Sequence, residues 1–365
     1  MTEEQPLRLG IVGANPTQGW APRTHLPAIV GLPEFDLTAV CTTKEESAKL
    51  SAEKFDAGKA YWNHQDMVAD PDIDVVDVCV RVPYHHQIVM DALEAGKDVY
   101  CEWPLGATTE QAREMADLAK AKGAHTMVGL QSRGSPSLLR LENLVHGGFI
   151  GKVLAVTMTH LAGGLLTPRT PDAIWRGDRR NGANTMTIAG GHSIDTITWV
   201  VSPFVEVAAN VGILAPEWPL EDGGKLAVDS PDHVSVTGRL ANGAIATVLV
   251  GSVPYNPPGF ELRIYGSTGT LVATGGQVQT LPVRVQGARK GEDLKDIEIP
   301  EHLRWVPPSV PEGTPVHFAQ MLSRFSEGIR GGSPVPPTFE DAVKNHELLD
   351  AIERSSETKS TVKIG

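Results

Sequence analysis

The stretch of sequence that decides the fold is residues 7–20, Leu7-Arg8-Leu9-Gly10-Ile11-Val12-Gly13-Ala14-Asn15-Pro16-Thr17-Gln18-Gly19-Trp20. An apolar run stops at Gly13, a turn of small residues follows, and a helical pattern begins at residue 24. A strand, a tight turn and a helix in this order are typical of a dinucleotide-binding unit, where glycines let a pyrophosphate approach the amides of the helix N-terminus. The glycine pattern is degraded here, because Asn15 and Gln18 stand where the second and third glycines are expected and Gly19 comes one place late.

The first third of the chain alternates between strand and helix patterns. Strands are expected at residues 7–12, 35–41, 74–80, 98–101 and 125–130, and helices at 24–30, 44–55, 87–95 and 109–122. This alternation predicts a parallel, doubly wound sheet that binds its ligand beyond the carboxyl ends of the strands. Cys41, Cys79 and Cys101 lie at the ends of apolar runs, which fits buried thiols in a reducing cytosol better than disulfides or a metal site.

The rest of the chain favours antiparallel strands. After a helix at 137–146, alternating patterns predict strands near 154–158, 234–236, 261–265, 270–273 and 278–281, and Asn242-Gly243 predicts a hairpin turn with positive φ angles. Residues 283–315 are expected to form a surface loop, followed by helices within 316–355 that pack back on the body. The fold class is therefore α/β, with an N-terminal doubly wound Rossmann domain over residues 1–130. Residues 131–365 form an α+β domain built on a large, mostly antiparallel open sheet.

Composition excludes several classes of function. The chain has 365 residues and a net charge of -12, which argues against a nucleic-acid surface, and the Arg176/Arg179/Arg180 cluster is too short to change that. No apolar stretch is long enough to span a membrane, and the acidic, polar start does not resemble a signal peptide, so we expect a cytoplasmic protein. The twelve histidines are scattered without the spacing of a metal site, and no metal is expected.

The end of the second expected strand indicates which dinucleotide is bound. A carboxylate there would bind the ribose 2′-hydroxyl of NAD, but the sequence offers Cys41-Thr42-Thr43-Lys44, two hydroxyls and a cation that suit a 2′-phosphate. NADP(H) is therefore preferred and NAD(H) possible. Alternatively, Thr43 only caps the following helix together with Glu46, which would leave Thr42 and Lys44 free.

Four motifs resemble the Gfo/Idh/MocA family of NAD(P)-dependent sugar and polyol oxidoreductases, nearly from end to end. They are the opening turn, Glu102-x-Pro104-Leu105, Gln131-Ser132-Arg133 and Gly191-His192-Ser193-Ile194-Asp195. The turn from Gly13 to Ala21 and the pair Glu102-Trp103 are most similar to the Gal80-like branch, whose best-known member is a fungal transcriptional regulator. The resemblance implies a small, carbohydrate-like substrate and a homodimer or homotetramer formed through the open sheet face.

Two positions depart from the family pattern. Trp103 replaces the lysine of the usual Glu-Lys-Pro motif, and Ile188 stands where an aspartate commonly precedes the histidine. The lysine helps to orient the reacting alcohol and to stabilise its developing alkoxide, which an indole cannot do. Trp103 could instead stack on the nicotinamide or on the apolar face of a sugar.

The candidate catalytic residues are His192, Trp103 and Asp195, with His192 as general acid/base and Asp195 one helical turn away. His192 could alternatively serve only as a hydrogen-bond donor to a ligand. The candidate substrate residues are Trp175, Arg176, His192 and Tyr255. The candidate cofactor-binding residues are Gly13, Asn15, Thr17, Gln18, Trp20, Thr42, Thr43, Lys44, Val82, Pro83, His85, Glu102, Trp103 and Gln131.

The sequence thus predicts an NADP(H)-preferring oxidoreductase that transfers hydride to or from a sugar, a sugar derivative or a related carbonyl. Two alternatives stay open at this point. One is a Gal80-like regulator or scaffold that binds a dinucleotide without turnover, which the loss of the lysine and the aspartate favours. The other is an enzyme that cycles a bound cofactor internally during an elimination or a glycoside cleavage.

Overall fold

The structure is a computed structural model that describes residues 5–280 and 282–365. The chain divides into two compact units. Unit 1 contains the residues up to Gly134 together with Arg304–Val343, and unit 2 contains Ser135–Leu303 together with Lys344–Gly365. Each unit therefore takes a second segment from the C-terminal part of the chain. The boundary expected between residues 130 and 131 stays a prediction.

Unit 1 is built on a parallel sheet of six strands in the order β3-β2-β1-β4-β5-β6. This is the order of a doubly wound dinucleotide fold, and it confirms the expected Rossmann architecture. Because all neighbours are parallel, the carboxyl ends of the strands share one edge of the sheet. The strands are β1 (Leu7–Val12), β2 (Phe35–Cys41), β3 (Lys59–Tyr61), β4 (Val75–Val78), β5 (Asp98–Glu102) and β6 (Thr126–Gly129).

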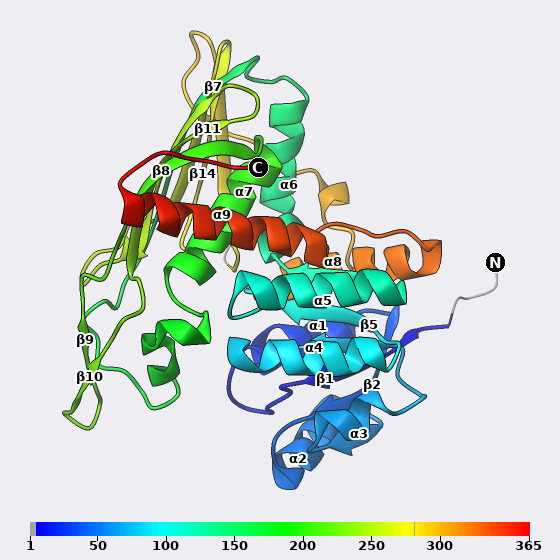
Figure 1. The fold of residues 1–365 in the computed structure, drawn as a ribbon. Coiled ribbons are helices and arrows are strands. Elements are labelled where there is room, and N and C mark those ends of the chain that lie inside the picture. Colours follow the sequence, from blue (N-terminus) through cyan, green and yellow to red (C-terminus); the bar gives the residue numbers. More distant parts are fainter. Residues whose placement is uncertain (1–4, 281) are drawn as a thin grey trace. The chain divides into compact units, whose positions relative to one another are not determined.

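Helices cover both faces of this sheet. On one face α4 contacts α3 and α5, and the label positions in Figure 1 show α4 and α5 side by side. On the other face α1 contacts α2 and α8, and the core there includes Leu26, Ile29, Phe318 and Leu322. The helices are α1 (His25–Gly31), α2 (Glu45–Phe55), α3 (His64–Val68), α4 (His85–Glu94), α5 (Thr109–Lys122) and α8 (Thr314–Gly331), with short turns η1 (Ala21–Arg23), η2 (Val82–Tyr84) and η3 (Gln131–Gly134).

Unit 2 is built on a nine-stranded sheet in the order β16-β15-β14-β13-β7-β12-β11-β8-β17. Only the β12–β7 pair among these neighbours is parallel, which confirms the expected, mostly antiparallel sheet. The strands are β7 (Val153–Ala162), β8 (Phe204–Gly212), β11 (His233–Leu240), β12 (Ile245–Ser252), β13 (Gly259–Gly266), β14 (Gly269–Gly275), β15 (Arg284–Arg289), β16 (Lys295–Asp296) and β17 (Val362–Lys363), with a separate ribbon of β9 (Glu217–Pro219) and β10 (Lys225–Ala227).

The helical elements of unit 2 include α6 and α7, which contact each other and are both labelled in Figure 1. A π-helical segment over Met186–Gly190 runs directly into α7. The elements are α6 (Pro136–His146), η4 (Ile174–Gly177), η5 (Arg179–Asn181), α7 (Gly191–Val200) and η7 (Glu301–Leu303), and α9 (Phe339–Thr358) begins in unit 1 and continues in unit 2.

Two expectations about the strands of unit 2 are wrong. Residues 278–280 form a turn rather than a strand, because Gly275-Gly276 ends β14 just before them, and Leu281 lies outside the described residues. The supposed loop at 283–315 contains β15 and β16. Charged residues end β15, but Val285 and Ala288 are buried within it, and Arg284 pairs with Asp296 across the two strands.

Two expectations about turns and caps are also wrong. In the β11–β12 hairpin Gly243 has a φ of +87°, while Asn242 is not among the residues with positive φ; Asn242 instead accepts a hydrogen bond from the Ala244 amide. A turn closed by a glycine with positive φ matches the right-handed strand twist without a second such residue. At α2 the N-cap is Lys44 rather than Thr43, and the Thr42 hydroxyl is not free, because it lies 2.7 Å from Ser47 Oγ.

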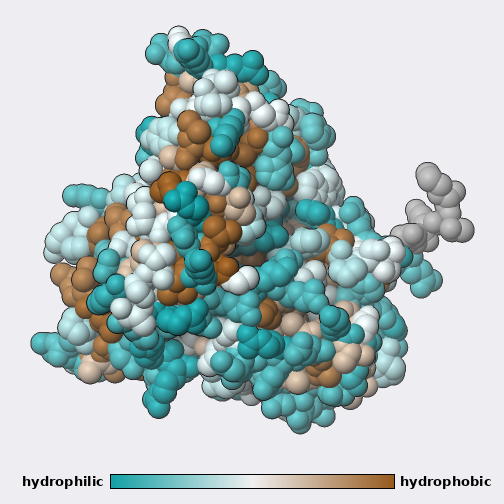
Figure 2. Space-filling model, turned by 45° about the horizontal axis from the view of Figure 1, so that its top comes forward, coloured by the Kyte–Doolittle hydropathy of each residue, from teal (hydrophilic) through white to brown (hydrophobic). Residues whose placement is uncertain are grey.

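The surface has the character of an ordinary globular protein. Figure 2 shows a face on which hydrophilic residues predominate, with smaller hydrophobic patches between them. Cys41, Cys79 and Cys101 are buried and free. Within the described ranges, no helix combines the length and the apolarity that crossing a membrane requires.

Candidate functional site

Gly13 forms the turn at the carboxyl end of β1. Its φ is +97°, and a Cβ at this position would overlap the carbonyl oxygen of Cys79, so only glycine fits. The Gly13 amide donates to the carbonyl of Cys41 at 2.9 Å, which ties the turn to the end of β2. Gly19 has a φ of +92°, but no heavy atom lies within 4 Å of its Cβ position. The space beside Gly19 is therefore open.

Asn15 organises the loop between β1 and η1. Its Oδ1 accepts hydrogen bonds from the amides of Thr17 and Gln18, both at 2.9 Å. Lys54 from α2 donates to the Pro16 carbonyl at 2.6 Å, and the indole N–H of Trp20 is buried without a hydrogen-bond partner among the described residues. An asparagine side chain thus gives this loop the local order that a glycine pattern alone would not provide.

The loop after β2 carries the residues expected to select the dinucleotide. Thr43 and Lys44 are exposed, and Thr42 is half-buried with its hydroxyl close to Ser47 Oγ and donating to the Lys44 carbonyl at 2.9 Å. No carboxylate stands at positions 41–44. The structure therefore places two hydroxyls and an ammonium group at the position where a ribose is bound in this fold.

A chain of buried polar groups runs beneath the same edge of the sheet. His25 Nδ1 lies 2.6 Å from Asp77 Oδ2, and His25 Nε2 lies 3.0 Å from Glu102 Oε1. Gln131 donates to Glu102 Oε1 at 2.6 Å, so neither contact uses Glu102 Oε2. The ring of Phe318 packs on His25 with 3.9 Å between the ring centroids.

The charge state of His25 follows from these contacts. Burial alone would lower the pKa of His25, but the charge of Asp77 and the hydrogen bond to it raise that pKa well above its ordinary value. Burial also raises the pKa of Asp77, and the positive charge of His25 opposes that rise. A protonated His25 can donate from both ring nitrogens, which joins β4 to the end of β5.

The other residues expected to bind the cofactor lie at the ends of β4 and β5. Both ring nitrogens of His85 lie near carbonyl oxygens, Nδ1 at 2.9 Å from Pro104 and Nε2 at 3.1 Å from Val80, and burial lowers the pKa of His85. His86 is instead paired with Glu114. Trp103 and Val82 are buried, and Pro83 is exposed. The cofactor roles of these residues stay predictions.

His192 lies in the first turn of α7, in unit 2, with 4% of its surface exposed. Its Nδ1 is buried with no hydrogen-bond partner in the described part of the chain. Burial and the neighbouring His160 lower the pKa of His192 to about 3. Asp195 is also buried in α7. His192 is therefore a neutral imidazole at pH 7.

Unit 2 contains a cavity of about 230 Å³ between the end of β7, the π-helical segment, β12 and the ribbon β9–β10. His160 lines it and holds Ser193 Oγ at 3.0 Å from its Nδ1, while burial lowers the pKa of His160 to about 4. Arg176 also lines the cavity, whereas Tyr255 is 78% exposed and neither Tyr255, Trp175 nor His192 is among the lining residues.

Two family descriptions match the chain. Residues 7–130 match "Oxidoreductase family, NAD-binding Rossmann fold", and residues 138–272 match "GFO/IDH/MocA C-terminal domain". The chain belongs to the Gfo/Idh/MocA family.

Relatives within the Gfo/Idh/MocA family include enzymes and a regulator. Dehydrogenase aclE of Aspergillus oryzae is 28% identical over 96% of this chain and 96% of its own length. The galactose/lactose metabolism regulatory protein GAL80 of Saccharomyces cerevisiae is 27% identical over 98% of this chain and 94% of its own. Levoglucosan dehydrogenase of Pseudarthrobacter phenanthrenivorans is 27% identical over 99% and 98%. A solved levoglucosan dehydrogenase in complex with NADH and levoglucosan has a TM-score of 0.85 at 25% identity, covering 99% and 100% of the two chains.

Four residues of this Gfo/Idh/MocA chain that the structure brings into these contacts are not predicted from the sequence: His25, Asp77, His160 and Arg169. A signal for Asp77 existed, because it is a carboxylate in the middle of an otherwise apolar strand, and a buried carboxylate requires a partner. His160 and Arg169 carried no such signal. Their role depends on which strands and turns surround the cavity, and that arrangement arises from tertiary packing.

Proposed function

We propose that this chain is an NADP(H)-preferring oxidoreductase that interconverts an alcohol and a carbonyl on a sugar or sugar derivative, with His192 as the acid/base. The observation that carries this proposal is the state of His192: a buried neutral imidazole whose Nδ1 has no hydrogen-bond partner in the described ranges. Such a nitrogen can accept a hydrogen bond from a substrate hydroxyl. To take the proton as well, His192 needs the bound substrate and cofactor to raise its low pKa toward neutrality. The family and the levoglucosan dehydrogenase relative support the reaction class.

The residues of unit 1 fit a dinucleotide. Gly13 holds a turn that no side chain could occupy, and the space beside Gly19 is open, so the backbone can be approached closely there. A bound nicotinamide would accept or supply the hydride. Glu102 keeps Oε2 for a ribose or carboxamide group, since His25 and Gln131 both use Oε1.

The remaining proposed roles complete the site. Trp103 gives an aromatic face for the nicotinamide or a sugar, and Asp195 orients His192 from the next turn of α7. His192 takes the proton from the hydroxyl as the carbonyl forms and returns it in the reverse reaction. We further propose a cytoplasmic homodimer or homotetramer associated through the open sheet face of unit 2.

Nicotinamide absorbance with the purified protein tests the proposal directly. We would screen aldoses, polyols, glycosides and their keto forms with NADP and with NAD. Turnover should fall by about 10² to 10⁴ in His192→Ala, because proton transfer is then left to solvent. His146→Ala is the matched control, since His146 lies on the surface of unit 2 with 53% of its side chain exposed. Equal turnover in the wild type and His192→Ala would contradict the role of His192.

The preference for NADP has its own test. Thr42→Asp places a carboxylate at the end of β2, where it can bind a 2′-hydroxyl and repel a 2′-phosphate. We expect the ratio of NADPH to NADH affinity, measured by fluorescence titration, to fall by about tenfold or more. Thr42→Val is the control for loss of the hydroxyl alone. A ratio unchanged by Thr42→Asp would show that the 2′-phosphate pocket lies elsewhere.

A regulator of the GAL80 kind is the second candidate. It is favoured by Trp103 and Ile188, which stand where the family pattern has a lysine and an aspartate. Dinucleotide binding without turnover on any substrate would support it. Product formation without net change in free NADP would instead support internal cycling of a bound cofactor.

A further inference from the structure

The cavity of unit 2 has an unusual charge balance. Of the residues that line it, the charged ones are Arg169, Arg176 and Asp232. Two guanidinium groups therefore face one carboxylate in a space of about 230 Å³. Whether the guanidinium of Arg169 is available to a ligand depends on what Arg169 and Asp232 already bind.

Arg169 is held in place by a ring rather than by an acid. Its guanidinium carbon lies 4.8 Å from the centroid of the Trp218 ring, and its backbone is fixed by a hydrogen bond from its amide to the Pro219 carbonyl at 2.8 Å. Its Nε is buried without a hydrogen-bond partner among the described residues, and no ion pair joins Arg169 to a described acid. Stacking leaves the edge of a guanidinium free to bind a planar anion.

Asp232 does not pair with Arg169. Its two carboxylate oxygens accept hydrogen bonds from the amides of Leu214 and Ala215, each at 2.8 Å, and its Oδ1 lies 3.5 Å from His233 Nδ1. This carboxylate is therefore committed to the loop that precedes β9. These amides leave the negative charge of the carboxylate in place but occupy both of its oxygens, and Asp232 forms no ion pair with Arg169.

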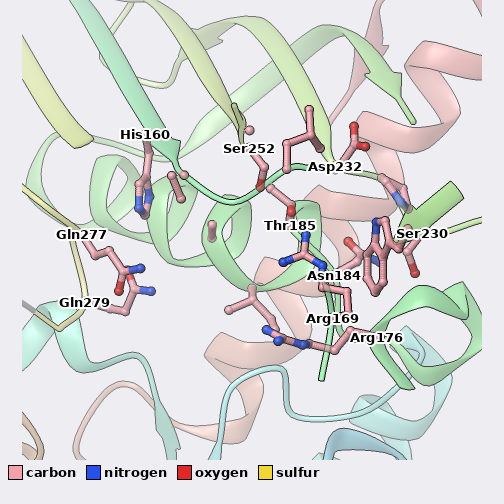
Figure 3. A pocket seen from close by; sticks show the side chains of 18 residues that line it. His160, Arg169, Arg176, Asn184, Thr185, Ser230, Asp232, Ser252, Gln277 and Gln279 are labelled. Carbon is pink, nitrogen blue, oxygen red and sulfur yellow. The ribbon is translucent and has the colours of Figure 1, made fainter. Parts of the chain in front are cut away.

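The other polar side chains of the cavity are neutral. Figure 3 shows the guanidinium groups of Arg169 and Arg176 extending into the cavity, with Gln277 and Gln279 across from them and His160 beside these glutamines. Ser230 Oγ is buried with no hydrogen-bond partner in the described ranges. Amide and hydroxyl groups of this kind match the hydroxyls of a sugar, while the guanidinium of Arg169 matches an acidic group.

We propose that this cavity binds an acidic carbohydrate, with Arg169 holding its carboxylate or phosphate group and the neutral polar residues holding its hydroxyls. As a statement about the substrate, this inference rests on the proposed oxidoreductase function. As a statement about binding, it stands on Arg169, on the committed Asp232 and on the polar lining. It distinguishes this chain from a relative whose solved complex contains levoglucosan.

Calorimetric titration with D-glucuronate, D-glucose 6-phosphate and D-glucose, with and without NADP, tests the inference. We expect at least one acidic sugar to bind ten times or more tightly than D-glucose, and the better of the two acidic probes identifies carboxylate or phosphate as the group held. Arg169→Gln should weaken that acidic sugar at least tenfold and leave D-glucose unchanged. Arg169→Lys keeps the charge without the stacked planar fork and should give an intermediate loss.

Arg180→Gln is the matched control, because Arg180 is exposed, pairs with Asp178 and is not among the residues lining the cavity. It should leave the binding of all three sugars unchanged. Equal binding of acidic and neutral sugars, acidic binding that survives in Arg169→Gln, or no binding of either acidic sugar would each overturn the inference.

These results separate the inference from the proposed function. Turnover of a neutral sugar that depends on His192, without preferential binding of an acid, keeps the oxidoreductase and overturns the acidic ligand. Acidic binding that depends on Arg169, without turnover of any sugar, keeps the acidic ligand and overturns the oxidoreductase.

Discussion

The polar cluster at the carboxyl edge of the unit 1 sheet and three polar groups of unit 2 differ in how far they are paired. At the carboxyl edge of the unit 1 sheet, His25, Asp77, Glu102 and Gln131 bind one another in a continuous chain. In unit 2, by contrast, His192 Nδ1, Arg169 Nε and Ser230 Oγ are buried without hydrogen-bond partners among the described residues. A buried polar atom without a partner costs about 1 to 3 kcal/mol. We infer that the cluster of His25, Asp77, Glu102 and Gln131 is a framework formed without a ligand, whereas the three unpaired groups of unit 2 gain partners when a ligand arrives. Within the described part of the chain, unit 1 also contains unpaired buried atoms outside these contacts, including Trp20 Nε1 and Tyr100 Oη.

The same contrast sets the charges of the histidines. His25 faces two carboxylates and has a raised pKa, while burial lowers the pKa values of His160 and His346 to about 4 and that of His192 to about 3. His25 is therefore a buried imidazolium, whereas the three histidines of unit 2 are buried neutral imidazoles, as is His85 of unit 1, whose pKa burial also lowers. The contribution of His25 to stability should respond to pH in the opposite direction to that of the three histidines of unit 2.

The largest expected effect is a loss of stability of unit 2 in acid. His160, His192 and His346 stay neutral in the folded chain but bind protons in the unfolded chain below its pKa of about 6.5. Their contribution is thus present above pH 6.5 and is lost as pH falls toward 4. The free energy of unfolding should drop by about 5 kcal/mol between pH 7 and pH 5 from these three groups. Urea unfolding at each pH, with hydrogen exchange to locate the loss in residues 135–303, measures it.

Variants isolate this acid effect from the titration of carboxylates. His160→Gln and His346→Gln should each reduce the slope of the free energy of unfolding against pH by about 1.4 kcal/mol per pH unit. His86→Gln removes a histidine that is paired with Glu114 at the surface of unit 1 and should leave the slope unchanged. Equal slopes in all three variants would show that the buried histidines of unit 2 do not set the acid response.

The next largest effect is expected in unit 1, from Asp77→Ala. This substitution leaves His25 buried without its main counter-charge, and breaking a buried pair in this way costs about 3 to 5 kcal/mol. Urea unfolding at pH 7 should show this loss. Glu114→Ala breaks a pair of the same chemistry, His86 with Glu114, in which 61% of the Glu114 side chain is exposed. Exposed pairs contribute about 0 to 1 kcal/mol, so similar losses in the two variants would contradict the contrast between buried and exposed pairs.

The sequence predicts well what depends on local pattern. Residues 35–41 and 109–122 were expected as a strand and a helix and form β2 and α5 with those bounds, because apolar runs, an N-cap threonine and a C-terminal glycine specify them locally. The sheet order of unit 1 follows from the alternation of such elements. Two predictions fail. At residues 278–280 the preceding glycines end a strand that the sequence pattern favours, and at β15 pairing with β14 makes a strand of a segment whose charge predicts a loop.

The residues of the candidate site also fall into those that local sequence identifies and those that only tertiary packing brings together. Gly13, Glu102 and Gln131 could be identified from motifs, because a turn after a strand or a polar residue at its end shows in sequence. The pairing of His25 with Asp77 joins residues 52 positions apart, and the approach of Arg169 to Trp218 joins a loop residue to strand β9. Contacts of this kind depend on tertiary packing, and a single sequence does not reveal them.

The smallest of these effects is expected above neutral pH and belongs to His25. Because its pKa is raised in the folded chain, His25 keeps its proton at pH values where the unfolded chain has already lost it. Its contribution to the free energy of unfolding is therefore complete below about pH 6.5 and is lost as the pH rises through the folded pKa. Between pH 6.5 and 8.5 the free energy of unfolding should fall, by at most about 1.4 kcal/mol per pH unit from this one group. The groups that face His25 are Asp77, Glu102 and Cys79, and burial raises the pKa of the Cys79 thiol to about 11, above this window. In Asp77→Ala the free energy of unfolding should change less over this pH range, because His25 then loses the charge that raises its pKa. A slope that survives in Asp77→Ala would show that another group of the chain causes the alkaline loss.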